Sequence, residues 1–266
     1  MAGADRLDRL LRDARIHGPV HDGRRDSHLA RLYTLSYTRC QMPIESLNGA
    51  NICCESHGTA GPRMVLVHGS WGDRHDWDKA VPDLSSIGRV VTYDRRGFGE
   101  SDRVPVPRSL RDEVRDLAAL IEHRRASPAH IIANSFGAII TLNLLIDRPD
   151  LVASAAIHEP PLIGLLEDPD APAQVRSYIN DADDRAAYTI DLKRLGSFGG
   201  PLMMSRGTQS PRLFDDILDI IGDALPRAQR YTFRGAGHVP HLTHPADYTM
   251  VIGAYVSGVA DASSQR

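Results

Sequence analysis

The sequence predicts an α/β fold built on a mostly parallel sheet with helices on both of its faces. Short apolar segments typical of strands alternate along the chain with longer segments whose apolar residues recur at helical spacing. The predicted strands are apolar at nearly every position, which is typical of strands that are covered on both faces. The chain has 266 residues, of which 42% are hydrophobic, and this is enough for one large domain with a substantial core.

The regular pattern begins at Ser46. Three strands are predicted in the first half of the chain, at residues 48–55, 64–67 and 89–93. A helix is expected near 77–85. Ser109 can cap the N-terminus of an amphipathic helix over 109–123, because Val114, Leu117 and Ile121 recur on one face of that segment.

The second half of the chain continues the alternation with one long interruption. Strands are predicted at 130–132, 152–158, 201–205 and 229–233, and helices at 138–146, 211–225 and 246–259. Between 159 and 199 the strand rhythm stops and prolines and acidic residues accumulate, with helices expected near 173–182 and 185–194. This segment is too long for a simple connection, so residues 160–198 are predicted to form a small helical cap, either alone or together with one ordinary crossover.

The predicted core therefore comprises residues 42–159 and 199–266. Residues 1–41 differ from it, because a short amphipathic stretch is followed by a polar, weakly patterned segment. We interpret 1–41 as a mobile N-terminal extension, with a lid or a helix that contacts a partner as the alternative.

The segment 128–140 is central to the functional interpretation. An apolar strand leads into Ala133-Asn134-Ser135-Phe136-Gly137, and an apolar helix follows. A serine at such a turn projects its hydroxyl away from the backbone and lies at a helix N-terminus, where N–H groups favour negative charge. Acyl transfer requires both a protruding nucleophile and nearby donors. Ala133 stands where the nucleophile-elbow motif has glycine, and its small side chain suits the close passage of strand and helix.

Composition argues against several other classes of function. The net charge of −3 gives no electrostatic footprint for nucleic acid. No spacing of cysteine and histidine resembles a metal site, and the three cysteines do not suggest a disulfide framework. The N-terminus lacks the apolar region of a signal peptide, and the most apolar stretch is interrupted by polar residues. We therefore expect a cytoplasmic protein that acts on a small molecule without a metal, cofactor, nucleic acid or membrane.

Four motifs together resemble the α/β-hydrolase superfamily over residues 46–260. In the family's numbering of strands, they are His68-Gly69 after the third strand (64–67 here), Asp94 to Ser101 after the fourth (89–93), the Ser135 turn after the fifth (130–132), and Gly235-Ala236-Gly237-His238 after the eighth (229–233). The resemblance implies an eight-stranded sheet and a triad in the order serine, acid, histidine. The serine identifies the serine-nucleophile branch, because the epoxide hydrolases and haloalkane dehalogenases carry aspartate at this turn.

The resemblance assigns Ser135 as nucleophile and His238 as base, with His241 and His244 as competitors for the base. The acid departs from the commonest pattern, because Ser210 stands where the family usually has aspartate, and a hydroxyl cannot stabilise an imidazolium as a carboxylate does. Glu159, directly after the sixth strand, is the natural substitute, since some branches carry their acid there. Asp215 and Asp216 are the fallback candidates for the acid.

Backbone N–H groups of Phe136 and of Ser70 or Trp71 are expected to form the oxyanion hole. Trp71 and Phe136 are also expected to line an apolar substrate pocket, whereas Trp77 is interpreted as a core residue.

The implied function is hydrolysis of an ester or lactone of a small, fairly apolar molecule by a Ser-His-Glu triad through an acyl-enzyme. Two alternatives remain open. The same triad could serve C–C cleavage, cofactor-free peroxidation or cyclisation in secondary metabolism, or the chain could be a ligand-binding protein on the hydrolase scaffold. Neither the substrate nor the oligomeric state can be read from the sequence.

Overall fold

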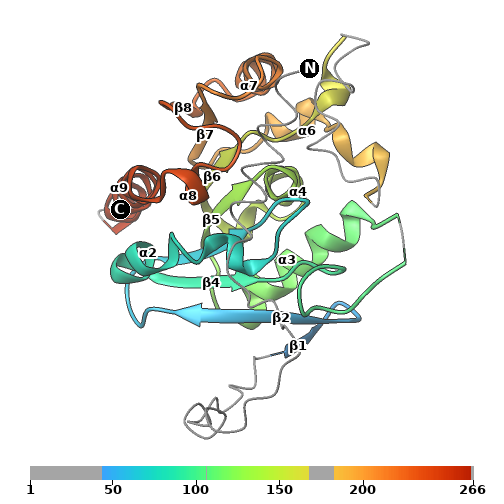
Figure 1. Ribbon diagram of the computed structural model, residues 1–266, viewed down its shortest axis with the longest axis vertical. Coiled ribbons are helices and arrows are strands. Elements are labelled where there is room, and N and C mark those ends of the chain that lie inside the picture. The colour runs from blue at the N-terminus through green and yellow to red at the C-terminus, as the bar shows by residue number, and fades with distance from the viewer. Residues whose placement is uncertain (1–43, 106, 168–182, 265–266) are drawn as a thin grey trace, which may run out of the picture. The chain divides into compact units, whose positions relative to one another are not determined.

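A single sheet organises the computed structural model, which describes residues 44–105, 107–167 and 183–264. In this part of the chain, eight strands are ordered β1-β2-β4-β3-β5-β6-β7-β8 (Figure 1). They are β1 (Ile44–Leu47), β2 (Ala50–His57), β3 (Arg63–Val67), β4 (Arg89–Tyr93), β5 (Ala129–Asn134), β6 (Val152–His158), β7 (Leu202–Gly207) and β8 (Gln229–Phe233). β1, β2 and β4 pair antiparallel, and the pairs from β4 through β3 to β8 are parallel.

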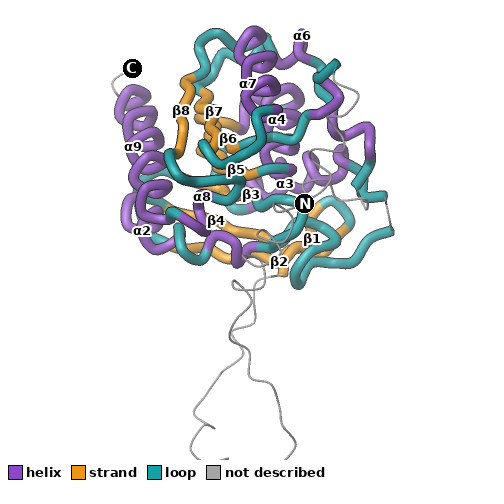
Figure 2. Tube along the Cα trace, turned by 45° about the horizontal axis from the view of Figure 1, so that its top comes forward, coloured by secondary structure: helices purple, strands orange, loops and turns teal. Residues whose placement is uncertain are grey.

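Helices cover both faces of this sheet (Figure 2). The α-helices are α2 (Val81–Ile87), α3 (Leu110–His123), α4 (Phe136–Asp147), α6 (Leu192–Leu195), α7 (Leu213–Ala224), α8 (Pro240–Thr243) and α9 (Pro245–Ser264). Short 3₁₀ turns are η1 (Arg74–Trp77), η2 (Pro149–Leu151), η3 (Ile163–Leu165) and η4 (Arg185–Tyr188). α2 and α9 pack together on one face, and α3, α4 and α7 lie on the other. The predicted fold, a mostly parallel sheet between two helical layers, is confirmed.

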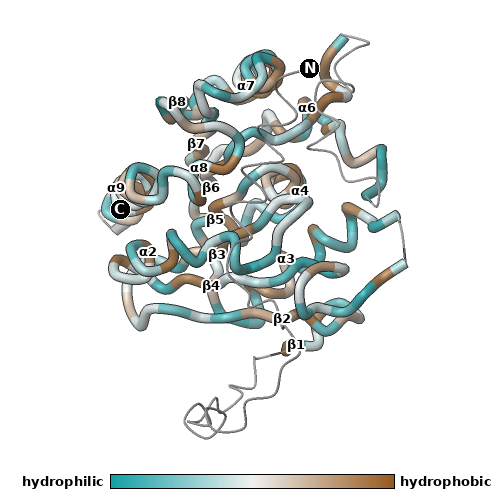
Figure 3. Tube along the Cα trace, viewed as in Figure 1, coloured by the Kyte–Doolittle hydropathy of each residue, from teal (hydrophilic) through white to brown (hydrophobic). Residues whose placement is uncertain are grey.

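The core has two parts, one on each face of the sheet. The larger part packs β3, β5 and β6 against α3, α4 and α7, and the smaller part packs the opposite faces of the same strands against α2 and α9. Every residue of β5 is buried, and the central strands are among the apolar parts of the tube in Figure 3. A strand buried on both faces fixes the position of whatever follows its carboxyl end, and the predicted nucleophile follows β5 directly.

Several predicted elements differ in their limits. The strand expected over 48–55 corresponds to β2, which begins two residues later because Asn48 and Gly49 have positive φ and form the turn after β1; β1 itself was not predicted. The helix expected near 77–85 is instead η1 followed by α2, which begins at Val81 with a proline in its first turn. Ser109 occupies the N-cap position of α3, but its side chain makes no capping hydrogen bond.

The helix expected near 185–194 is also wrong as a continuous element. The Asp184 carboxylate accepts a hydrogen bond from the Ala186 N–H and caps η4, and the Asp191 carboxylate caps α6 in the same way. Two N-caps within eight residues start two short helices in place of one. The predicted extension 1–41 and the predicted helix near 173–182 lie outside the described residues. No helix in the described ranges is long and apolar enough to span a membrane.

Candidate active site

Ser135 lies at a strained turn between β5 and α4. Its φ of 56° and ψ of −123° are conformations that a residue with a side chain rarely adopts. The backbone can form this turn because the residues around it are small. Ala133 is completely buried, and a Cβ on Gly137 would lie 2.4 Å from the Val67 carbonyl oxygen. Gly69 also passes close, since a Cβ there would lie 3.0 Å from the Ser135 Cβ. Strand, loop and helix thus converge at Ser135, which is the geometry of a nucleophile elbow.

Glu159 follows β6, the neighbour of β5, and also has a positive φ, of 46°. Its side chain is completely buried. The carboxylate accepts two hydrogen bonds on different oxygens: Oε1 accepts one from the Gly207 N–H at 2.7 Å, and Oε2 lies 2.7 Å from His238 Nδ1. A carboxylate bonded to the Nδ1 side of a histidine fixes the ring tautomer and stabilises its cation.

His238 is held from two directions. Besides the contact with Glu159, its backbone carbonyl accepts a hydrogen bond of 2.8 Å from Asn134 Nδ2, and Asn134 directly precedes Ser135. The ring stacks on Phe214 with centroids 5.1 Å apart and planes at 24°. The loop that carries His238 is therefore hydrogen-bonded both to Asn134, at the end of β5, and to Glu159.

The pKa of the Glu159 carboxyl reflects competing effects. Burial alone would raise this pKa, but charge interaction with His158, the hydrogen bond with His238 and the nearby Ser210 hydroxyl lower it to about 2. The Glu159 carboxyl group is therefore ionised at neutral pH, as the predicted role of orienting an imidazolium requires.

The other candidate acids lie elsewhere. Ser210, at the position where the family usually has aspartate, is near enough to Glu159 to contribute to its low pKa. Asp215 forms an ion pair with Arg206, and Asp216 is exposed in the first turn of α7. Of the predicted acids, Glu159 is the one that the structure brings into contact with His238.

The predicted oxyanion residues are arranged around the same turn. Phe136 is the first residue of α4, and the first N–H groups of a helix have no acceptor within the helix. Ser70 is buried in the loop after β3, and its hydroxyl donates to Asp183 Oδ2 at 3.3 Å. Trp71 is 68% exposed. The assignment of these N–H groups to the oxyanion hole stays a prediction.

Arg95 lies within the Asp94–Ser101 motif but was not among the predicted site residues, and it supports the loop after β3. It is 1% exposed, and its Nη1 donates to the Gly69 carbonyl oxygen at 2.8 Å. Glu113 on α3 pairs with the same guanidinium through both carboxylate oxygens, at 2.5 and 3.1 Å. The guanidinium also lies 4.8 Å from the centre of the Phe136 ring. Arg95 thus links the loop after β3 to the residue after the serine.

Asp183 makes a second link, between the segment after the undescribed residues and the loop after β3. Its side chain is completely buried, and Oδ1 accepts hydrogen bonds from Arg108 Nε and Nη2 at 3.1 and 2.7 Å. Its Oδ2 accepts from Ser70 and from the Tyr188 hydroxyl, each at 3.3 Å. Tyr188 in turn meets Phe136 edge-on, with ring centroids 5.5 Å apart.

The Phe136 side chain is completely buried between Arg95 and Tyr188. Tyr188 and Phe214 are aromatic neighbours of the site that the sequence did not single out, since neither lies in a motif. The prediction that Trp71 and Phe136 line a substrate pocket is not decided by these contacts and stays a prediction.

The competing histidines have other surroundings. His241 is buried and stacks on Trp77 with ring centroids 4.4 Å apart, and burial lowers its pKa to about 3. His244 Nδ1 lies 2.9 Å from the Thr243 hydroxyl oxygen. Neither is shown in contact with a carboxylate among the described residues. Trp77 is completely buried, as expected of a core residue.

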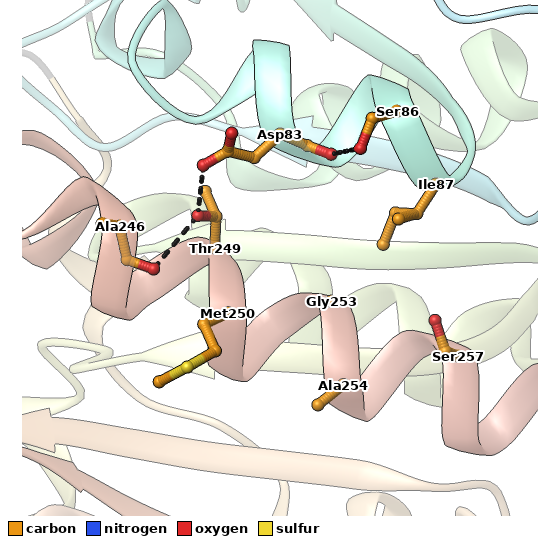
Figure 4. A pocket seen from close by; sticks show the side chains of 9 residues that line it. All are labelled: Asp83, Ser86, Ile87, Ala246, Thr249, Met250, Gly253, Ala254 and Ser257. Atoms are coloured by element: carbon orange, nitrogen blue, oxygen red, sulfur yellow. Dashed lines mark hydrogen bonds between the residues drawn. The ribbon is translucent and has the colours of Figure 1, made fainter.

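A groove on the outer surface contains none of the predicted site residues. It has a volume of about 460 Å³ and lies between α2 and α9, with Ile87 and Met250 at its wall (Figure 4). Thr249 bridges the two helices by donating to Asp83 Oδ2 at 2.7 Å. Within the described ranges, histidine, cysteine, aspartate and glutamate form no group of three or more suited to a metal ion.

Comparison with known proteins places these features in a wider context. Residues 64–218 match the model of the alpha/beta hydrolase family. An uncharacterized hydrolase, YraK, from Bacillus subtilis (strain 168) is 37% identical over 120 residues, which are 44% of this chain and 44% of that protein. The chain thus spans less than half the length of the curated relatives that it matches first.

Two solved structures share the fold. Est816, described as an N-acyl homoserine lactone degrading enzyme, superposes with a TM-score of 0.68 at 18% identity and covers 80% of this chain and 99% of its own. The enol-lactonase from Burkholderia xenovorans LB400 gives a TM-score of 0.67 at 17% identity, with 81% and 100% covered. At this identity the likeness concerns the fold alone.

Proposed function

The chain belongs to the alpha/beta hydrolase family, and on that premise we propose that it cleaves an ester or lactone of a small, fairly apolar molecule. Ser135 is the proposed nucleophile, His238 the base and Glu159 the acid. The observation that supports this assignment best is the 2.7 Å contact between Glu159 Oε2 and His238 Nδ1, on a loop that is bonded to the residue before Ser135.

The proposed reaction has two steps. His238 Nε2 accepts the proton of the Ser135 hydroxyl as its oxygen attacks the substrate carbonyl carbon, and the leaving alcohol takes that proton when the carbon–oxygen bond breaks. Water then attacks the acyl-enzyme with the same base, which releases the acid and restores the serine. Glu159 holds the imidazole and stabilises its cation, and backbone N–H groups bind the oxyanion.

Lactones are the first substrates to test. Two proteins of the same fold are described as lactone-degrading enzymes, and the aromatic groups of Tyr188 and Phe214 near the site suit an apolar substrate. We propose that the activity is cytoplasmic and directed at a free small molecule.

Labelling by a fluorophosphonate tests the proposal without knowledge of the substrate. Intact mass spectrometry should find one adduct per chain in the wild type and none in Ser135→Ala. Folding of the variant is checked by circular dichroism. A folded wild type that gives no adduct would reject an activated serine and return attention to the ligand-binding alternative. A panel of lactones and short-chain esters would follow a positive result.

A further inference from the structure

His158, the last residue of β6, touches the backbone or side chain of each segment that carries a proposed triad residue. Its carbonyl oxygen accepts a hydrogen bond from the Ser135 N–H at 2.9 Å. Its ring Nε2 lies 3.3 Å from the carbonyl oxygen of Gly237, the residue before His238, and 3.5 Å from Glu159 Oε1. No sequence motif assigns a role to this histidine, because it is the last residue of a strand and precedes the proposed acid.

From these contacts we infer that His158 is a positioning residue, whose imidazole holds Glu159 and the loop that carries His238 in place. The inference rests on the triad assigned in the proposed function. The ring is 1% exposed and is fixed on its other side by the Ser205 hydroxyl of β7, 3.0 Å from Nδ1. A side chain clamped in this way defines the position of the groups that it contacts.

The protonation of the ring follows from its neighbours. Burial lowers the pKa of His158 to about 4, so the ring is neutral at neutral pH. Its Nε2 faces two acceptors, the Gly237 carbonyl oxygen and the Glu159 carboxylate, so the proton belongs on Nε2. Nδ1 then accepts a hydrogen bond from the Ser205 hydroxyl. The same hydroxyl has a second acceptor within reach, the Ile157 carbonyl oxygen, which lies 3.1 Å from Ser205 Oγ.

This N–H complements the other contacts of Glu159. The Gly207 N–H already occupies Oε1 at 2.7 Å, and His238 occupies Oε2. At 3.5 Å the His158 N–H acts on the carboxylate mainly as a dipole, while at 3.3 Å it restrains the Gly237 carbonyl. Loss of the N–H removes the donor that lies near both the Gly237 carbonyl oxygen and the Glu159 carboxylate.

The test compares three variants of buried histidines. His158→Met removes both ring nitrogens at similar volume, whereas His158→Gln keeps an N–H near the position of Nε2. His130→Met is the matched control: His130 is 6% exposed on β5, and its Nδ1 also lies 2.8 Å from a serine hydroxyl of the neighbouring strand, that of Ser154. It does not belong to the proposed site.

Two readouts are followed: the rate constant of fluorophosphonate labelling, and the downfield proton resonance of the His238 Nδ1–H in water. We expect His158→Met to slow labelling by about tenfold or more and to shift or broaden the resonance. His158→Gln should recover most of the rate. His130→Met should lower the melting temperature and leave both readouts unchanged.

The inference is overturned if His158→Met labels at the wild-type rate with an unchanged resonance, or if the methionine and glutamine variants slow equally. If His158→Met does not fold, Ser205→Ala replaces it in the test, because this variant removes the partner of His158 Nδ1. An unchanged labelling rate and an unchanged resonance in Ser205→Ala would then overturn the inference. If the wild type is not labelled at all, the proposed function fails. The resonance still reports on positioning in that case, because it requires no nucleophilic serine.

Discussion

Ser135 and Glu159 follow residues that are direct partners across neighbouring parallel strands. Asn134 of β5 pairs with His158 of β6, and each of these two strands is followed by a residue of positive φ, 56° at Ser135 and 46° at Glu159. Strained backbone of this kind persists when the surroundings enforce it, and it clusters at functional sites. The two turns therefore present the proposed nucleophile and acid at one level of the sheet, where the loop after β8 brings His238.

Replacing the acid without changing its shape should disable turnover. Glu159→Gln keeps the volume but removes the negative charge that stabilises the His238 cation. We expect kcat to fall by about a thousandfold or more, with circular dichroism unchanged. The measurement is steady-state hydrolysis of the best ester or lactone found in the substrate panel. Near-normal turnover in this variant would contradict the assignment of the acid.

Ser210 offers a rescue experiment for that variant. It occupies the position after β7 where the family usually has its acid, and it lies close to Glu159. Adding Ser210→Asp to Glu159→Gln should recover part of the lost kcat, because a carboxylate is again available to His238. Ser210→Asp in the wild-type background is the control. If the double variant is no faster than Glu159→Gln alone, position 210 cannot serve as an acid site in this chain.

The sequence predicted the fold and the elements around the site well. The alternation of apolar strands and helices was enough to predict the fold, because buried parallel strands form short, nearly continuous apolar segments. The observed limits of β4 and β8 match the expected ones. Segments governed by local turn chemistry were less predictable. Asn48 and Gly49 form a turn where the first two residues of a strand were expected, and the Asp184 and Asp191 caps divide one expected helix into two short ones.

Motifs located the proposed triad residues, but they did not show which residues support them, even where such a residue, Arg95, lies inside a motif. Arg95 and Asp183 each act through contacts far apart in the sequence, with Glu113 and with Arg108. A charged residue of this kind looks in sequence like any exposed one, because burial and pairing arise from tertiary packing. Nothing in the sequence indicated the role of His158, for a related reason. It lies in a strand whose other residues are mostly apolar, and its contacts with polar groups arise only in the folded chain.

The low pKa of Glu159 predicts a definite pH dependence of stability. The pKa falls from 4.5 in the unfolded chain to about 2 in the folded one, so the folded state binds fewer protons between these values. The stabilisation is fully present above about pH 4.5 and is lost as the pH falls through 2. It amounts to on the order of 3 kcal/mol.

Urea unfolding at a series of pH values measures this effect. The difference in free energy of unfolding between the wild type and Glu159→Gln should shrink progressively from pH 5 towards the lowest pH at which both remain folded. Asp216→Asn provides the comparison, since Asp216 is exposed on α7. A wild-type to Glu159→Gln difference that stays constant with pH would show that the Glu159 pKa is not depressed in the folded state.

Gly137 should be intolerant of any side chain. A Cβ there would lie 2.4 Å from the Val67 carbonyl oxygen and 2.6 Å from that of His68, and backbone atoms cannot move aside cheaply. We expect Gly137→Ala to lower the free energy of unfolding by about 2 kcal/mol or more. Gly258→Ala is the matched control, because nothing lies within 4 Å of its Cβ and alanine favours helix α9.

Gly258→Ala should raise stability by about 0.5–1 kcal/mol. Denaturant titration of both variants gives the comparison in one experiment. Equal stability of Gly137→Ala and the wild type would mean that α4 can move away from the loop after β3, and the close packing at the serine turn would then be incorrect.

The buried pair of Arg95 and Glu113 should couple stability to activity. Both side chains are 1% exposed, so Glu113→Gln leaves a buried guanidinium without its carboxylate. The expected loss is about 3 kcal/mol in free energy of unfolding. Arg95 also donates to the Gly69 carbonyl, so fluorophosphonate labelling of Ser135 should slow as well.

The exposed pair of Arg194 and Asp147 is the control: Asp147→Asn should change neither quantity measurably, because surface pairs contribute little. A Glu113→Gln protein that is destabilised but labels at the wild-type rate would show that Arg95 stabilises the fold without positioning the loop next to Ser135.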